Sequence, residues 1–373
     1  MRFARPYITV ASAAGVIATI RFPRGHTCLR AKNALLGMII IILLSLNLLQ
    51  KPPVAPAREV PFGLCQTVVV SETKTISPRL VTPVTHVRRE PGYEQDFWGT
   101  VQFSPVPAFL IFTHDPIRQD VFISGSVHRA TEPWDPYIWN LFVNILTKTG
   151  PNTDLIVDVG ANLGYFTLLA ASMGRNVIAF EPMGRNMAKL QASVVRNGFQ
   201  DRVTLYQNAV SSLQGNTVRL TVTHESNQGN GKAAFISRPT FGIYGVDYAE
   251  TVTLDQVIRQ DVLLMKIDVE GLESAVLDGA KDLLCWHIVR FITLEFSTDT
   301  RDSQLCPVQD VLTLLETLGY AISDVVPGAP RLDPAQYRQY PPNILLSLEH
   351  TLQPPALRLG PFSVCGQDKQ YRI

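Results

Sequence analysis

The sequence VDVGANLGYFT, residues 157–167, is the stretch that decides the fold. An apolar run at 155–159 ends in a turn with Gly160 and Gly164, and a helical pattern follows at 165–173. Glycines at the end of a strand let the backbone turn tightly and approach a ligand closely. The free N–H groups at the start of the next helix favour an anionic group. The stretch therefore predicts a strand, a ligand-binding turn and a helix.

Strand and helix patterns alternate through the rest of residues 151–349. Strands are predicted at 177–180, 203–207, 263–267 and 292–296, helices at 185–197, 254–258, 272–284 and 308–318, and closing strands at 320–326 and 343–348. This alternation predicts an α/β fold with an open, mostly parallel sheet and helices on both faces. Two closing strands after the fifth strand–helix unit fit a seven-stranded sheet that ends in an antiparallel hairpin. A further strand pair, 218–223 and 233–236, flanks the polar loop 224–232.

Residues 98–150 are expected to form an N-terminal cap on this domain. Two short apolar runs, 108–113 and 121–125, are typical of strands and are separated by a turn-like segment. The pattern at 136–148 predicts a helix that begins with Pro136, a position where a helix tolerates proline. Because variable loops on a rigid sheet usually carry specificity, we expect substrate contacts from 98–135 and 224–232.

An acid at the end of the second predicted strand is the second part of the expected site. Glu181 lies 21 residues beyond Gly160. A carboxylate at this position accepts hydrogen bonds from ribose hydroxyls. S-adenosylmethionine and NAD both carry such a ribose, so Glu181 alone does not distinguish between them.

The block KIDVEG, residues 266–271, lies at the end of the fourth predicted strand and supplies two more acids. Asp268 and Glu270 should emerge at the ligand edge of the sheet, where either one can orient a ligand or accept a proton. Asp268 alternatively caps the following helix. A metal site at these two acids needs a third ligand that the sequence does not identify, so no metal is expected. His128 is a reserve candidate for the proton acceptor.

Taken together, these blocks resemble the FkbM-type methyltransferase family. The matching segments are VDVGANLGYFTLLAA (157–171), VIAFEPMGRN (177–186), ESNQGNG (225–231), NAVSS (208–212), TVTLDQVI (251–258), LLMKIDVEGLESAVLDGA (263–280) and TLEF (293–296). The resemblance covers residues 105–348. It implies the Rossmann-like methyltransferase fold, S-adenosylmethionine as the cofactor, and O-methylation of a hydroxyl on a glycan or a small molecule.

The resemblance also implies roles for individual residues. The glycine turn would hold the methionine end of the cofactor, Glu181 its ribose, and the Asn208–Ala209 region would lie beside its adenine. The block around Asp268 would border the transferred methyl group. The expected cofactor-binding residues are Asp158, Gly160, Asn162, Gly164, Glu181, Asn208, Ala209 and Asp268, and the expected catalytic residues are Asp268, Glu270 and Glu295.

Two other functional classes remain open on the sequence. An NAD(P)-dependent oxidoreductase would share the turn and Glu181, but this turn has Asn162 where the second glycine of GxGxxG would stand. A non-catalytic binding protein on the same fold is the second alternative, because a fold does not determine a function.

The N-terminal region is basic and contains one long apolar run. The first acid is Glu59, and residues 34–49 read ALLGMIIIILLSLNLL. As a helix this run is about 24 Å long, against a bilayer core of about 30 Å. We expect a basic leader at 1–33, a membrane anchor at 34–50, a stalk at 51–97 and a tail at 350–373. A cleaved signal peptide and a buried helix are the alternatives.

The basic leader and the cysteines bear on location and partners. Positive charge before the apolar run predicts a cytoplasmic N-terminus and a catalytic domain in the Golgi or ER lumen, with a mitochondrial transit peptide as the alternative. Four of the five cysteines follow the anchor, and either disulfides or free thiols are compatible with that number. A net charge of +1 gives no reason to expect a nucleic-acid partner. The oligomeric state stays open.

Overall fold

The computed structural model describes two separate parts of the chain. Backbone and side chains are described for residues 96–150, 155–222, 226–227, 246–296 and 308–349, and the backbone alone for 7–11, 17–21, 232–235 and 245. The chain divides into two compact units, Met1–Glu59 and Val60–Ile373. In the first unit, β1 (Tyr7–Ala11) pairs antiparallel with β2 (Ile17–Arg21).

The predicted anchor at 34–50, the tail at 350–373 and nearly all of the stalk lie outside the described residues. None of the helices that the structure does describe combines the length and the apolar composition needed to cross a bilayer.

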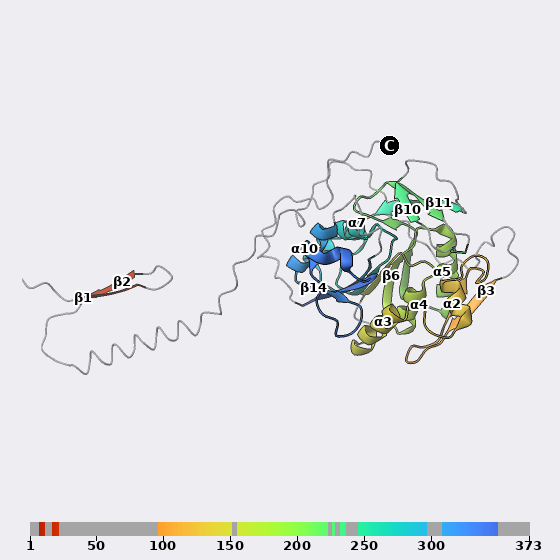
Figure 1. Cartoon of the computed structure of the whole chain (residues 1–373), viewed down its shortest axis with the longest axis horizontal. Helices are drawn as coiled ribbons and strands as arrows, with labels where there is room; N and C mark the ends of the chain where they lie inside the picture. Colours follow the sequence, from red (N-terminus) through yellow and green to blue (C-terminus); the bar gives the residue numbers. More distant parts are fainter. Residues whose placement is uncertain are drawn as a thin grey trace, which may run out of the picture. The chain divides into compact units, whose positions relative to one another are not determined.

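The centre of the second unit is a seven-stranded sheet (Figure 1). Its strands, in spatial order, are β14 (Tyr320–Asp324), β15 (Asn343–Leu348), β13 (Val289–Glu295), β12 (Val262–Ile267), β5 (Leu155–Val159), β6 (Asn176–Phe180) and β7 (Val203–Tyr206). Neighbouring strands are parallel except that β15 runs antiparallel to both β13 and β14. The predicted mostly parallel sheet with a closing antiparallel hairpin is confirmed. Strand β15, the last in the sequence, lies between β14 and β13.

The direction in which the strands are added reverses between β5 and β12. The chain places β6 and β7 on one side of β5 and then crosses to β12 and β13 on the other side. Ligands of open α/β sheets bind outside the carboxyl ends of the strands at such a switch point. The residues that follow β5 and β12 are therefore where a site is expected.

Helices cover both faces of the sheet, and the strands alternate their side chains between two cores. Leu155, Val157 and Val159 of β5 belong to the core on one face, whereas Ile156 belongs to the core on the other, as the two-residue period of a strand requires. The first core is completed by α6 (Leu254–Val257), α7 (Glu273–Asp278), α8 (Lys281–Trp286) and α10 (Val308–Thr317). The second is completed by α3 (Pro136–Lys148), α4 (Tyr165–Ser172) and α5 (Gly184–Asn197).

The single helix predicted at 272–284 is wrong, because α7 and α8 are separated at Gly279. A Cβ on Gly279 would lie 2.2 Å from the carbonyl oxygen of Ser211, so only glycine fits there. The Asp255 backbone N–H donates to the Gly279 carbonyl (3.0 Å), and the Asp255 carboxylate accepts from the Leu283 N–H (2.8 Å). Asp255 thereby replaces the helical hydrogen bond between Leu283 and Gly279.

The strand expected at 121–125 is also wrong, because these residues begin helix α2 (Ile123–Arg129). The Asp120 carboxylate accepts hydrogen bonds from the backbone N–H groups of Phe122 (3.0 Å) and Ser124 (2.8 Å). These bonds satisfy donors that the start of a helix leaves unpaired. A five-residue apolar run does not by itself distinguish a strand from a helix.

A second, smaller sheet has the strand order β10 (Lys232–Phe235), β9 (Thr217–Val222), β11 (Gly245–Val252) and β8 (Ala209–Val210). The predicted pairing of 218–223 with 233–236 is confirmed by the antiparallel pair of β9 and β10. Strand β11 was not predicted, because its sequence GVDYAETV mixes acids with apolar residues.

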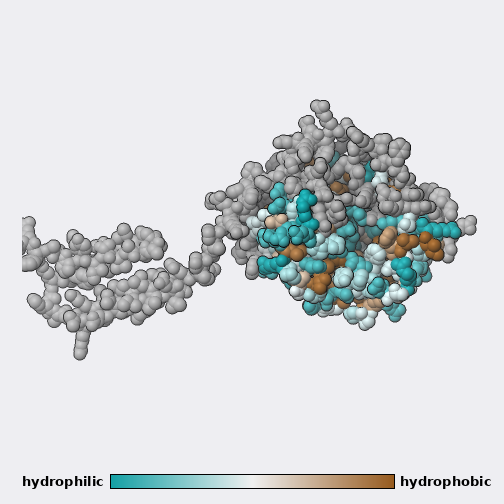
Figure 2. Space-filling model, viewed as in Figure 1, coloured by the Kyte–Doolittle hydropathy of each residue, from teal (hydrophilic) through white to brown (hydrophobic). Residues whose placement is uncertain are grey.

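On the face of the second unit shown in Figure 2, apolar residues form small patches within a mostly hydrophilic surface. Scattered apolar residues of this kind are usual on soluble surfaces.

A hairpin of β3 (Phe97–Val101) and β4 (Phe109–Thr113) packs beside α5. Strand β4 confirms the predicted run at 108–113. Asn197 of α5 accepts from the Leu110 N–H (2.8 Å) and donates to the Leu110 carbonyl (2.6 Å). Ser193, one turn earlier, accepts from the Phe112 N–H (2.8 Å). Polar side chains of α5 thus take the place of a neighbouring strand along β4.

We predict that Asn197→Ala lowers the free energy of unfolding by about 1–3 kcal/mol, because two backbone groups of Leu110 lose their partner. Urea denaturation of the variant and of the wild type measures the difference. Asp201→Ala is the control, since Asp201 forms an exposed ion pair with Arg202, and solvent screens such a pair so that its loss should barely change stability. An Asn197 variant as stable as this control would contradict the structural importance of the contact.

Candidate functional site

A cavity of about 310 Å³ opens at the carboxyl ends of β5, β6, β12 and β13. This volume lies at the lower end of the range of about 300–1,000 Å³ for small-molecule sites. The predicted site residues that line it are Gly160, Asn162, Glu181, Asn208, Ala209, Asp268, Glu270 and Glu295. Most of the residues selected from the sequence are therefore brought together at one place.

The glycine turn after β5 is held tightly against the end of β12. Gly160 has a φ of 81°, and a Cβ at this position would lie 1.8 Å from the backbone oxygen of Asp268. The N–H groups of Gly160 and Ala161 both donate to the carbonyl of Phe180 (2.9 Å each). The turn is thus fixed to the ends of two neighbouring strands, and the Asp268 backbone occupies the place where a side chain of residue 160 would stand.

Glu181 is buried at the end of β6 and faces the same cavity. Its Oε2 accepts from the Asn162 N–H and its Oε1 from the Met183 N–H, both at 2.8 Å. Burial raises the pKa of Glu181 to about 7, although these hydrogen bonds oppose the rise. An ionised carboxylate has lone pairs left for further donors, such as the hydroxyls of a ribose.

Two expected cofactor-binding residues, Asp158 and Gly164, do not line the cavity. Asp158 is buried beneath the turn, where its Oδ2 accepts from the Thr167 hydroxyl (2.6 Å). Gly164 has a φ of 84°, and a Cβ there would lie 2.1 Å from Leu190 of α5. Asp158 connects the strand to the first turn of α4, and Gly164 permits close packing of α4 against α5.

Asn208 and Ala209 line the opposite wall of the cavity together with Phe180 and Leu220. The Asn208 side-chain amide donates to the Glu250 carbonyl (3.1 Å) of the unpredicted strand β11. This wall has the mainly apolar character that the flat face of an adenine requires.

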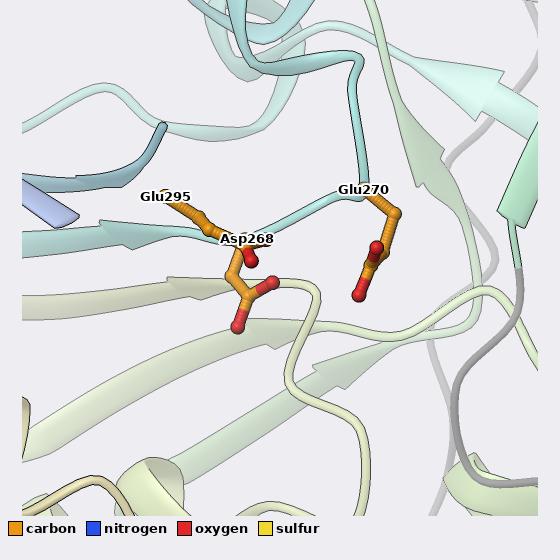
Figure 3. Close-up of side chains that lie close together, drawn as sticks. All are labelled: Asp268, Glu270 and Glu295. Carbon is orange, nitrogen blue, oxygen red and sulfur yellow. The ribbon is translucent and has the colours of Figure 1, made fainter. Parts of the chain in front are cut away.

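Three carboxyl groups meet on the other side of the turn. Figure 3 shows the side chains of Glu295 and Asp268 close together, while the side chain of Glu270 extends from the loop that follows β12. Oxygen atoms of Asp268, Glu270 and Glu295 all lie within 4.8 Å of one another. The sequence did not identify a third acid that could join Asp268 and Glu270 in a metal site, and Glu295 takes that place in the structure. Three carboxyl groups of this kind resemble the oxygen ligands of a divalent cation.

A lysine that sequence reasoning missed supplies positive charge at this cluster. Lys266 Nζ lies 2.8 Å from Asp268 Oδ2, and its side chain is 10% exposed. Burial lowers the pKa of Lys266, but the charges of Asp268 and Asp158 outweigh burial and raise it, so the ammonium form is stable. A lysine within the apolar run LLMKI was the available signal, because a buried ammonium requires acidic partners.

Asp268 and Glu295 hold their protons very differently. Burial would raise the pKa of Asp268, but the Lys266 ammonium and a hydrogen bond with Glu295 hold it below its ordinary value. Burial, with the negative charge of Asp268 second, raises the pKa of Glu295 to about 10. At neutral pH the pair of carboxyl groups therefore shares one proton.

The remaining wall of the cavity comes from the two regions expected to contact substrate. Phe122, Ile123, Trp134 and Asp135 come from the N-terminal cap, and Asn227 comes from the loop at 224–232. Three of the four non-glycine residues with positive φ in the described part of the chain, Asp135, Asn162 and Glu270, line the cavity. Such strained backbone is concentrated at functional sites.

His128, the reserve candidate, is exposed and does not line the cavity. Its Nε2 forms a hydrogen bond with the Thr113 hydroxyl (3.0 Å).

The fold and the site together define a class of protein. The dinucleotide-binding order has six strands in the order 3-2-1-4-5-6. This sheet instead ends with an antiparallel strand inserted beside β13, which is the arrangement of Rossmann-like methyltransferases. The glycine turn and Glu181 line the cavity where the sequence analysis expects the cofactor.

Comparison with known families identifies this class more closely. Residues 158–322 match the family model of the Methyltransferase FkbM domain. This part of the chain is therefore similar to the FkbM methyltransferase domain, a class of domain whose methyl donor is S-adenosylmethionine. No curated protein matches the chain.

Several solved structures are similar to the chain at low identity. A methyltransferase FkbM from Methylobacillus flagellatus is 18% identical, with 62% of this chain and 56% of that chain covered and a TM-score of 0.34. A Streptococcus mutans protein in complex with SAH is 9% identical, with 56% and 96% covered and a TM-score of 0.34. An rRNA methylase from Streptococcus thermophilus is 12% identical, with 56% and 93% covered and a TM-score of 0.33. The chain thus spans just over half the length of the first of these proteins.

We predict that S-adenosylhomocysteine binds more tightly as pH rises through about 7. Ribose hydroxyls donate to the ionised form of Glu181, and its pKa near 7 leaves about a tenth of the free protein ionised at pH 6. The dissociation constant should therefore be about tenfold larger at pH 6 than at pH 8, as measured by calorimetry. Glu181→Gln should bind more weakly and independently of pH over this range. A flat profile for the wild type would show that Glu181 is not the ribose ligand.

Proposed function

We propose that the protein is an O-methyltransferase that transfers the methyl group of S-adenosylmethionine to a hydroxyl of a glycan or a small molecule. One observation carries the proposal: the carboxyl groups of Asp268 and Glu295 lie within 4.8 Å of each other and line the same cavity as the glycine turn and the wall expected to contact substrate. A hydroxyl acceptor needs a carboxylate or a histidine to take its proton.

The chain fits the cofactor in two respects. Gly160 lets the turn pack against the Asp268 backbone at the edge of the cavity, and Glu181 offers a carboxylate to a ribose. S-adenosylmethionine supplies an activated methyl group, so the protein mainly has to align the acceptor and exclude water.

The chemistry assigned to the chain itself is proton transfer. As the acceptor oxygen forms its bond to the methyl carbon, the carbon–sulfur bond breaks with its electron pair remaining on sulfur. The hydroxyl proton passes to the Asp268 carboxylate, which Lys266 keeps ionised. Glu270 is the second candidate for the proton acceptor, since it lies in the same cluster.

A glycan or a similar polyhydroxyl compound is the acceptor that the cavity wall supports best. Phe122 and Trp134 provide aromatic surface, while Asp135 and Asn227 provide hydrogen-bonding groups. Apolar surface with a few placed polar groups is typical of small-molecule sites.

We place this activity in the lumen of the Golgi or ER, with the chain anchored by residues 34–50. Cys285 is disulfide-bonded, and disulfides persist in oxidising compartments such as the ER lumen. Alkaline carbonate should leave the full-length protein in the membrane pellet. Release into the supernatant would contradict the anchor.

Calorimetric titration of the full-length protein with S-adenosylhomocysteine and with NAD tests the identity of the cofactor and the functional class of the protein. We expect binding of S-adenosylhomocysteine and none of NAD. The opposite result would indicate an oxidoreductase, and binding of neither ligand would indicate a non-catalytic protein.

We predict that Asp268→Asn lowers kcat by about 10²–10⁴-fold, the usual contribution of a general base, with S-adenosylhomocysteine affinity within a few fold of the wild type. Transfer of labelled methyl to a panel of neutral oligosaccharides and small alcohols gives the rate. Glu270→Gln is the matched variant and should lose less activity. Full turnover in both variants would exclude both carboxylates as the base.

A further inference from the structure

A buried histidine outside the cavity is connected to the cofactor-binding acid. His114 follows β4, is 1% exposed, and its Nε2 lies 2.8 Å from Oδ1 of Asn186 in α5. The Asn186 amide nitrogen lies 3.4 Å from Oε1 of Glu181. Three buried polar side chains from separate elements therefore form a chain that ends at the predicted ribose ligand.

The direction of these hydrogen bonds follows from Glu181. A carboxylate only accepts, so the Asn186 amide turns its NH₂ group toward Glu181 and its oxygen toward His114. His114 must then donate from Nε2, which identifies its tautomer. Burial, with the charge of Lys189 second, lowers the pKa of His114 to about 3, so the ring is neutral and holds this tautomer at physiological pH.

The same histidine is connected to the substrate side of the cavity through its backbone. The His114 N–H donates to the Ser124 hydroxyl (3.2 Å), and that hydroxyl donates to Asp120 (2.7 Å). Asp120 also accepts from the Phe122 N–H and forms an isolated β-bridge with Asn227. Phe122 and Asn227 both line the cavity.

We propose that His114 is a positioning residue that orients Glu181 through Asn186 and ties this orientation to the 120–124 segment on the substrate side. The proposal rests on the proposed function for the identity of the ligand at Glu181. A partly satisfied buried network costs more than its separate bonds suggest, so breaking one contact should disturb its neighbours.

The test compares S-adenosylhomocysteine affinity among full-length variants at pH 8. His114→Leu removes the donor to Asn186 and should weaken binding by about tenfold, within the usual 5–150-fold range of coupling between sites. His114→Gln keeps an N–H donor and should restore most of the affinity. Asn186→Ala should weaken binding at least as much, and it tests the same contact if His114→Leu does not fold.

Asn197→Ala is the matched control, because Asn197 also joins α5 to β4 but its described hydrogen bonds go to Leu110 and Ser193. It should lose stability and keep its affinity for S-adenosylhomocysteine.

A second readout separates positioning from a merely structural role. The Asn186 hydrogen bond lowers the pKa of Glu181, whereas burial and the charge of Asp158 raise it. The pH of half-maximal S-adenosylhomocysteine affinity should therefore move upward in His114→Leu and Asn186→Ala and stay unchanged in Asn197→Ala.

Each outcome bears on one claim. Folded His114→Leu or Asn186→Ala protein with wild-type affinity and an unshifted pH profile would overturn the positioning role and leave the methyltransferase proposal intact. A wild-type protein that fails to bind S-adenosylhomocysteine would overturn the proposed function and, with it, this inference.

Discussion

The close approach of Gly160 to the Asp268 backbone is the contact on which the site depends. It brings the turn after β5 against the end of β12, at the point where the strand order reverses. Glu181 and the carboxyl cluster of Asp268, Glu270 and Glu295 line the cavity beside this contact. Any side chain at residue 160 would force the two apart, since a Cβ there would stand 1.8 Å from the carbonyl oxygen. The geometry of the cavity therefore depends on the absence of a side chain at residue 160.

Sequence patterns predicted the helices and strands whose local periodicity matches their place in the folded structure. The buried strand 155–159, the helix 136–148 and the strand pair around the loop 224–232 were each recognisable from periodicity and their flanking residues. The same agreement identified Glu181 and Asp268, because each follows an apolar strand directly.

The sequence failed where a distant group replaces a local interaction. Gly279 ends a helix because Asp255 takes over its hydrogen bond and Ser211 presses against it, and neither is near in sequence. Lys266 was overlooked as a site residue because its importance depends on acids from other strands. Asp158 and Gly164 have the right spacing for ligand contacts, but they lie behind the turn and support it.

Strand β15 is made last but lies between β14 and β13, so the sheet is complete only after residues 343–348 have been translated. Glu295 pairs in register with Asn343, and Asn343 itself lines the cavity. Asn343 is translated almost two hundred residues after the glycine turn at Gly160. Because domains generally fold as units during translation, the turn and Glu295 reach their final arrangement only after strand β15 has been made. A chain that ends before residue 343 would lack the strand that pairs with both β13 and β14.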